Sequence, residues 1–210
     1  QILPINDTTM TRTWVDSYPY KANSTFALHP MFLRLSELGT LADADRQAYY
    51  DSLGRELNAL KEIDYERVNN GKMEFAREIF AQEGKKVMSS KEFKDFVIQN
   101  EYWLKPYAAF CVLRDKFDTP DYTKWGEYAD YDAEKVERLV CDNVYEINFV
   151  YYLQFNLDKQ MHAAKNYANS KGVALKGDIP IGISRTSVDA WLNPRLFNLD
   201  CQAGAPPDDF

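Results

Sequence analysis

The sequence is poor in the residues that build most metal centres and nucleophilic triads. Its 210 residues include 2 histidines and 3 cysteines, and no two cysteines form a CxxC pair. Cys111, Cys141 and Cys201 lie far apart along the chain, so the sequence predicts neither a zinc site nor a framework of disulfide bonds. Widely spaced cysteines are typical of a reducing compartment, and we therefore expect a cytoplasmic protein.

The chain also lacks clusters of basic residues and long apolar runs. Its formal net charge is −7, and no local group of Lys and Arg offsets that balance. This charge opposes nucleic acid and anionic membranes as partners. No apolar run reaches the length of about 18 residues that a membrane-spanning helix needs.

Several common sites are excluded because one of their required residues is missing. The glycines after residue 170 do not stand at a following helix start, so they make no phosphate-binding fingerprint. Asp43 and Asp45 open a calcium-loop pattern, but its glycine and terminal glutamate are absent. Ser184 lacks the flanking glycines of a nucleophile elbow. The sequence therefore predicts no metal and no cofactor.

Aromatic residues, by contrast, are plentiful at 14% of the chain, with 14 Tyr and 4 Trp. Their faces suit sugar rings, but composition alone favours the reading that they fill an ordinary core. A long irregular stretch that ends near Leu35 carries WVDSYPYKANSTFALHP, which has neither helical nor strand periodicity. Loops of this length are usually functional or disordered, and the aromatic content argues against disorder.

Helical periodicity dominates residues 43–170, where apolar residues recur three or four positions apart. The run SSKE, which begins at Ser89, matches a capping box, and Pro106 suits the first turn of a further helix. The longest predicted helix covers residues 143–169, with Gly172 as its terminator.

Residues 1–5 and 173–183 both read as strands. Because a helical excursion of more than a hundred residues separates them, the pattern predicts parallel strands with an inserted helical subdomain. In each predicted strand an apolar run is followed by polar residues at the carboxyl end. Parallel α/β barrels form their active sites at this end of the strands.

Asp178 ends the second of these strands, in the stretch KGDIPIGISRTSVDAW. A strand-end aspartate is most often a buried acceptor for backbone donors. The nearby Ser184, Asp189 and Trp191 favour the other reading, because such side chains can bind hydroxyl groups and stack on a sugar. Asp178 is thus a candidate for the rim of a site.

Three motifs carry a resemblance to a known family. GDIPIGISRTSVDAW, followed by NPRLFNLD and AGAPPDDF, resembles the 4-α-glucanotransferases called amylomaltases or disproportionating enzymes, glycoside hydrolase family 77. LPI with DSYPYKANSTFALHP is similar to the family's LPL and DSPYQS-x-S-x-FAGNP. Tyr18 is inserted here, and Leu28 and His29 replace Gly and Asn. These departures resemble the large multidomain branch of the family.

The resemblance implies an α/β fold that is mainly helical by residue count, namely a partial (β/α)8 TIM barrel with a large inserted helical subdomain. Residues 1–40 would hold the first barrel strand and a sugar-site loop, residues 41–170 the helical subdomain, and residues 171–210 the next barrel strand and active-site loops. The implied activity is cleavage of α-1,4-glucans and transfer of the released glucanosyl unit to an acceptor sugar by a retaining double displacement.

No catalytic residue is expected within residues 1–210, because the family's nucleophile and acid/base follow the AG-x-PPD-x-F loop. Asp178 resembles the strand-end aspartate near the cleavage subsite, and Ser17 and Tyr20 match the DSPY loop. The substrate-binding set that the resemblance implies is Asp16, Ser17, Tyr20, Asp178, Trp191, Asp208 and Phe210. The partners would be α-1,4-glucans and small acceptor sugars, and unpaired strand edges would favour self-association of the chain on its own.

Two other readings stay open at this point. An autonomous glucan-binding or helical interaction module could share the motifs, and it would bind sugar as the 210-residue chain. A purely structural helical domain would bury the aromatic residues at positions 14, 18, 20 and 191.

Overall fold

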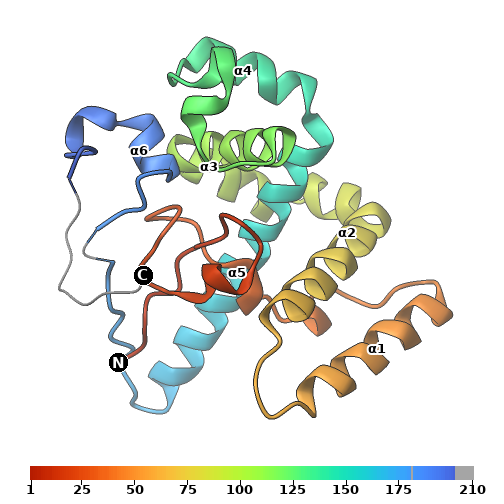
Figure 1. Ribbon diagram of the computed structural model, residues 1–210. Helices are drawn as coiled ribbons and strands as arrows, with labels where there is room; N and C mark the ends of the chain where they lie inside the picture. The colour runs from red at the N-terminus through yellow and green to blue at the C-terminus, as the bar shows by residue number, and fades with distance from the viewer. Residues whose placement is uncertain (181, 202–210) are drawn as a thin grey trace.

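The computed structural model describes residues 1–180 and 182–201, and most of this part is helical (Figure 1). The α-helices in these ranges are α1 (Ala44–Asn58), α2 (Tyr65–Ser89), α3 (Lys91–Phe117), α4 (Ala133–Asp142), α5 (Val144–Ser170) and α6 (Val188–Leu192). Short 3-10 helices lie at Trp14–Ser17, Pro30–Phe32, Leu35–Glu37, Tyr122–Lys124, Gly126–Tyr128 and Pro194–Leu196. The expected helical majority is confirmed.

Helices α3 and α5 form the central pair of the core, with α2 against α5 and α1 against α2. Aromatic rings fill these interfaces: Phe80 of α2 lies 5.1 Å from Tyr152 of α5, and Phe93 of α3 lies 5.4 Å from Phe155, between ring centroids. Edge-to-face and tilted pairs at such distances add to the apolar area they bury. Most of the abundant aromatic residues of the helical part therefore have a packing role.

The predicted helix ends are partly confirmed. The capping box that begins at Ser89 placed the helix start one residue too early: Ser89 ends α2, and the Ser90 hydroxyl caps α3 by accepting the backbone N–H of Phe93 at 3.2 Å. Gly172, with φ of +74°, follows the end of α5 as predicted. Only glycine adopts that φ without strain. The placement of Pro106 was wrong, because it lies inside α3 and begins no new helix.

Burial explains why α3 continues through Pro106. An internal proline removes one helix hydrogen bond and costs about 3 kcal/mol. Leu104, Tyr107 and Phe110 on either side are buried in the core, so ending the helix there would expose three large apolar side chains. Their burial outweighs the cost of the proline.

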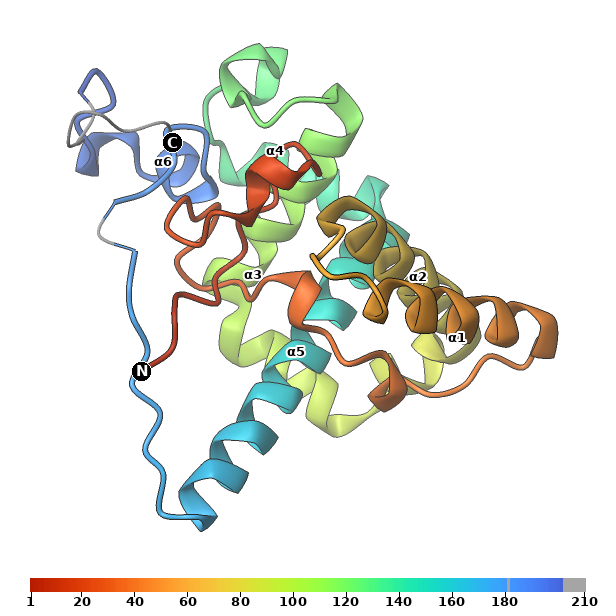
Figure 2. The same cartoon turned by 60° about the horizontal axis from the view of Figure 1, so that its bottom comes forward.

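The two predicted strands were wrong as regular strands, since the described residues contain only isolated bridges in those segments. Ile2 forms a parallel bridge with Gly177: the Ile2 N–H donates to the Lys176 carbonyl, and the Asp178 N–H donates to the Ile2 carbonyl, both at 2.9 Å. The predicted parallel direction is thus confirmed. Figures 1 and 2 show the N-terminus beside the segment that follows α5.

Two prolines explain why this ladder stops after one bridge. In a parallel ladder that starts from the Ile2–Gly177 bridge, the next two hydrogen bonds would need the backbone N–H groups of residues 4 and 180. Both residues are prolines, which have no N–H to donate.

No helix of residues 1–180 and 182–201 combines the length and the apolar character needed to cross a membrane.

Candidate functional site

Tyr20 and Asp178 lie together although 158 positions separate them in the sequence. The Tyr20 hydroxyl donates a hydrogen bond to Oδ2 of Asp178 at 2.9 Å, and Oδ1 accepts the Ile179 N–H at 3.1 Å. The hydrogen bond to this carboxylate raises the pKa of Tyr20, because it favours the neutral phenol. The parallel bridge next to Asp178 joins its segment to Ile2.

The loop that carries Tyr20 also meets the segment that begins α6. Thr25 donates to the Asp189 carboxylate with its backbone N–H at 2.9 Å and with its hydroxyl at 3.1 Å, and the Val188 N–H donates to the Asn23 carbonyl at 3.0 Å. Burial raises the pKa of Asp189, while the Thr25 donors oppose that rise. These bonds join the loop that carries Tyr20 to the start of α6.

Asp16 is buried within the loop. Its carboxylate accepts the backbone N–H groups of Met10 at 3.0 Å, Thr11 at 2.9 Å and Arg12 at 2.6 Å. Arg12 has φ of +62°, a left-handed conformation that costs energy in a residue with a side chain. The Asp16 carboxylate therefore stabilises this turn, whereas the neighbouring Ser17 is exposed.

Trp191 lies in the core and is 2% exposed. Its ring centroid is 5.0 Å from Tyr131, 5.7 Å from Trp125 and 6.0 Å from Phe110, and its indole N–H donates to the Tyr128 carbonyl at 2.9 Å. In this position the ring presents no free face to a sugar. Its place in substrate binding stays a prediction.

Other aromatic rings of the loop that carries Tyr20 reach the surface. Trp14 is 62% exposed and Tyr18 is 37% exposed, and the rings of Tyr18 and Tyr20 are 5.7 Å apart. A purely structural domain would bury these side chains, so that reading fails at Trp14 and Tyr18. Asp208 and Phe210, the remaining members of the predicted set, lie outside the described residues.

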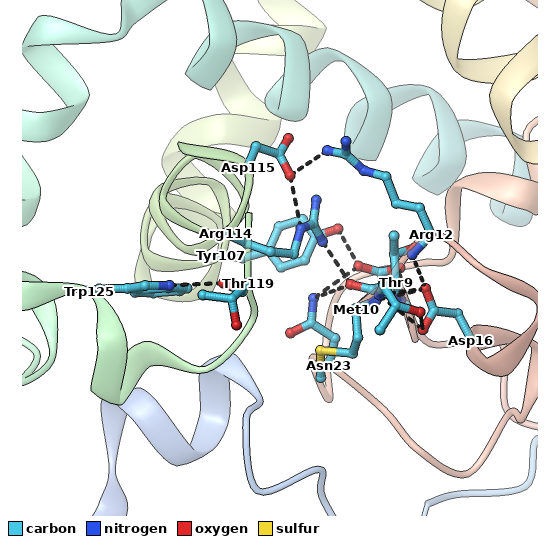
Figure 3. A network of polar contacts seen from close by, with 12 residues as sticks. Thr9, Met10, Arg12, Asp16, Asn23, Tyr107, Arg114, Asp115, Thr119 and Trp125 are labelled. Carbon is cyan, nitrogen blue, oxygen red and sulfur yellow. Dashed lines mark hydrogen bonds and ion pairs between the residues drawn. The ribbon is translucent and has the colours of Figure 1, made fainter. Parts of the chain in front are cut away.

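Sequence reasoning missed a buried polar cluster beneath the loop. The Asp7 carboxylate accepts the Tyr107 hydroxyl at 2.8 Å. Nη1 of Arg114 donates to the Thr9 carbonyl at 2.7 Å (Figure 3). Burial raises the pKa of Tyr107 well above its ordinary value. The one available signal was the polar run after QILPI, because nothing in the local pattern distinguishes Tyr107 and Arg114 from other helical residues.

His29 is buried at the end of the loop, where it replaces the family's Asn. Its Nδ1 accepts the Met31 N–H at 3.0 Å, so Nε2 carries the proton and donates to the Tyr65 hydroxyl at 2.9 Å. Burial lowers the pKa of His29, and nearby Lys72 lowers it further, against an opposing effect of Asp7 and Asp16.

This lowered pKa predicts acid sensitivity. Below about pH 6.5 the unfolded chain protonates His29 while the folded chain does not, so the free energy of unfolding falls as the pH falls. The slope from this one group can reach about 1.4 kcal/mol per pH unit. Urea unfolding between pH 7.5 and 5.5 should show a steeper fall for the wild type than for His29→Asn. Identical slopes in the two proteins would contradict the prediction.

Among residues 1–180 and 182–201, no group of three or more His, Cys, Asp or Glu side chains is arranged to hold a metal ion.

Comparison with known proteins gives the family. A family model described as 4-alpha-glucanotransferase matches residues 1–210. The chain is 45% identical to a 4-alpha-glucanotransferase of Oryza sativa subsp. japonica over 100% of this chain and 22% of the rice protein. It is 33% identical to a 4-alpha-glucanotransferase of Chlamydia muridarum, over 99% of this chain and 38% of that protein.

A solved structure agrees with this result at the level of the fold. The amylomaltase from Streptococcus agalactiae in complex with acarbose superposes with a TM-score of 0.76 at 23% identity, over 100% of this chain and 42% of that one. The chain thus spans between 22% and 42% of the lengths of these three proteins. Because the family model covers every residue, the chain belongs to the 4-alpha-glucanotransferase family.

Proposed function

We propose that the chain is an N-terminal part of the catalytic domain of a 4-α-glucanotransferase that acts on α-1,4-glucans such as maltodextrins. The observation that carries this proposal is the contact between Tyr20 and Asp178, because it unites two family motifs from opposite ends of the sequence. The loop that carries Tyr20 also carries the exposed Ser17 and the exposed rings of Trp14 and Tyr18. Such a surface offers hydroxyl acceptors next to flat rings, which is the chemistry that a glucan needs.

In the proposed reaction the chain binds and orients the glucan. Each carboxylate oxygen can accept two hydrogen bonds, so Asp178 keeps acceptor capacity for sugar hydroxyls after bonding Tyr20 and Ile179. A retaining double displacement needs one carboxylate as nucleophile and a second carboxyl group as acid/base. We assign both to the part of the protein outside residues 1–210, so the 210-residue chain would be inactive by itself.

The finer architecture is proposed on the same basis. Residues 1–40 would supply the first strand and sugar-site loop of a (β/α)8 barrel, residues 41–170 an inserted helical subdomain, and residues 171–210 the next strand. The parallel Ile2–Gly177 bridge supports this arrangement, since neighbouring barrel strands run parallel.

The proposed setting is the cytoplasm, without nucleic acid or membrane partners, which the net charge of −7 and the three unpaired thiols support. Leu3 and Ile179, beside the bridge, are 60% and 73% exposed. Apolar side chains next to an unextended ladder favour association, so we expect the isolated chain to self-associate.

Transfer and hydrolysis can be separated with a labelled acceptor. The full-length protein is incubated with maltotriose and radiolabelled glucose, and the glucans are separated by length. A transferase places the label in longer glucans, because glucose accepts the glucanosyl unit. Maltotriose consumption that leaves all the label in glucose would instead identify a hydrolase, and no consumption would remove the proposed function.

A further inference from the structure

We propose that Tyr107 and Arg114 of α3 are positioning residues for the glucan site, an inference that rests on the proposed function. They hold Asp7 and Thr9 at the base of the loop that carries Tyr20. Through this loop they set the position in which Tyr20 and Asp178 meet a glucan. The inserted helices would then have a part in the reaction beyond packing.

The contacts from α3 are short and buried. The Tyr107 hydroxyl donates to Oδ2 of Asp7 at 2.8 Å, and the two residues are 3% and 1% exposed. Nη1 of Arg114 donates to the Thr9 carbonyl at 2.7 Å, while its Nε donates to Asp115 at 3.0 Å. Figure 3 shows Tyr107 and Arg114 directed from the helix toward Thr9 and Asn23 of the loop. Because α3 is a long helix packed in the core, the positions of these two donor side chains are fixed at the helix backbone.

Asp7 in turn forms hydrogen bonds with two later residues of the loop. Its backbone N–H donates to the Ala27 carbonyl at 2.8 Å, and its carbonyl accepts the Asn23 N–H at 2.7 Å. The Asn23 side chain donates to the Asp7 carboxylate at 3.3 Å and lies near the Thr9 carbonyl at 3.4 Å. Tyr20 stands three positions before Asn23, so a shift of Asp7 would move the segment that holds Tyr20.

Polar contacts join the loop to α3 where the two border a pocket. This pocket has a volume of about 520 Å³, and Thr9, Tyr107 and Arg114 are among its lining residues. Close packing fixes side chains only where neighbouring atoms touch. Beside this pocket, α3 holds the loop through the bonds to Asp7 and to the Thr9 carbonyl and through the ion pair of Arg12 with Asp115.

The alternative is that the contacts of Tyr107 and Arg114 with Asp7 and Thr9 only stabilise the fold. A buried charge such as Arg114 is costly unless it is paired, so its bonds to Asp115 and Thr9 would be needed in any case. The two interpretations predict different effects of a substitution in α3. If these contacts only stabilise the fold, the substitution lowers the amount of folded protein whether or not Tyr20 is present. If they position the loop, the substitution lowers activity mainly when Tyr20 is present.

A double-mutant cycle in the full-length protein tests this difference. Tyr107→Phe removes one hydroxyl and keeps the ring, and it is measured with Tyr20 present and in a Tyr20→Phe background. We expect kcat/KM for maltotriose transfer to fall about tenfold with Tyr20 present and by less than about twofold without it. Tyr152→Phe, which removes a hydroxyl from a core ring packed on Phe80, is the matched control and should leave kcat/KM unchanged.

Arg114→Lys provides a second variant, because it keeps the charge but loses the planar fork. Equal losses in both Tyr20 backgrounds would overturn the inference. So would failure of Tyr107→Phe and Arg114→Lys to fold while Tyr152→Phe folds, since that result assigns the cluster a structural role. A wild-type protein without transfer activity overturns the proposed function and this inference with it, whereas an active wild type with additive losses overturns the inference alone.

Discussion

Asp178→Ala in the full-length protein is expected to lower the turnover of maltotriose by about 100-fold and to shift the thermal midpoint by less than about 2 °C. Asp178 is only half-buried, so its removal costs little folding energy. The same change removes the acceptor of the Tyr20 hydroxyl and the proposed acceptor for sugar hydroxyls. Steady-state kinetics and thermal unfolding of the same preparation provide the two measurements.

Two control variants test whether the loss of activity comes from removing the Asp178 carboxylate or from a general effect of losing an acidic side chain. Asp178→Asn keeps an oxygen that can accept from Tyr20, so we expect a smaller loss of turnover than in Asp178→Ala. Asp130→Ala removes an exposed carboxylate and should change neither quantity. If Asp178→Ala loses thermal midpoint and activity in proportion, the carboxylate has a structural role and the proposed site is wrong.

Trp191→Ala is expected to lower the free energy of unfolding by about 3–5 kcal/mol, which is the usual cost of deleting a fully buried large aromatic side chain. The ring is 2% exposed and packs against Phe110, Trp125 and Tyr131, and its N–H bond to the Tyr128 carbonyl would also be lost. Urea unfolding of the 210-residue chain, at a protein concentration where it is monomeric, measures the change.

Trp14→Ala is the matched control for this variant. Trp14 is 62% exposed, so the same substitution there should change the free energy of unfolding by less than about 0.5 kcal/mol. Equal stability of Trp191→Ala and the wild type would contradict the packing described for Trp191.

The sequence predicted helices well where local rules decide. Apolar periodicity located the helical part, and Ser90 and Gly172 marked helix ends by their own hydrogen bonding and conformation. Local rules failed where distant burial or pairing decides. Pro106 continues a helix because its neighbours are buried, and the prolines at positions 4 and 180 leave a single bridge where apolar runs predicted strands.

The candidate site shows the same division. The contact of Tyr20 with Asp178 followed from the resemblance of whole motifs, since no local pattern relates residues 158 positions apart. The bond of Tyr107 to Asp7 spans 100 positions, and a tyrosine on an apolar stripe looks like any core residue. Trp191 was ambiguous in the sequence. A tryptophan beside polar residues can stack on a sugar, or it can lie in the core with its indole N–H bonded to one acceptor.

Maltotriose incubated with the pure 210-residue chain, in parallel with the full-length protein, tests whether residues 1–210 only bind and orient the glucan while the nucleophile and the acid/base lie elsewhere in the protein. We expect glucose and longer glucans from the full-length protein and none from the chain alone, because loss of such groups lowers rates by orders of magnitude. Glucan products that rise with the concentration of the chain across independent preparations would contradict this expectation, and Asp178, Asp189 and Asp208 would become the first candidates for catalysis.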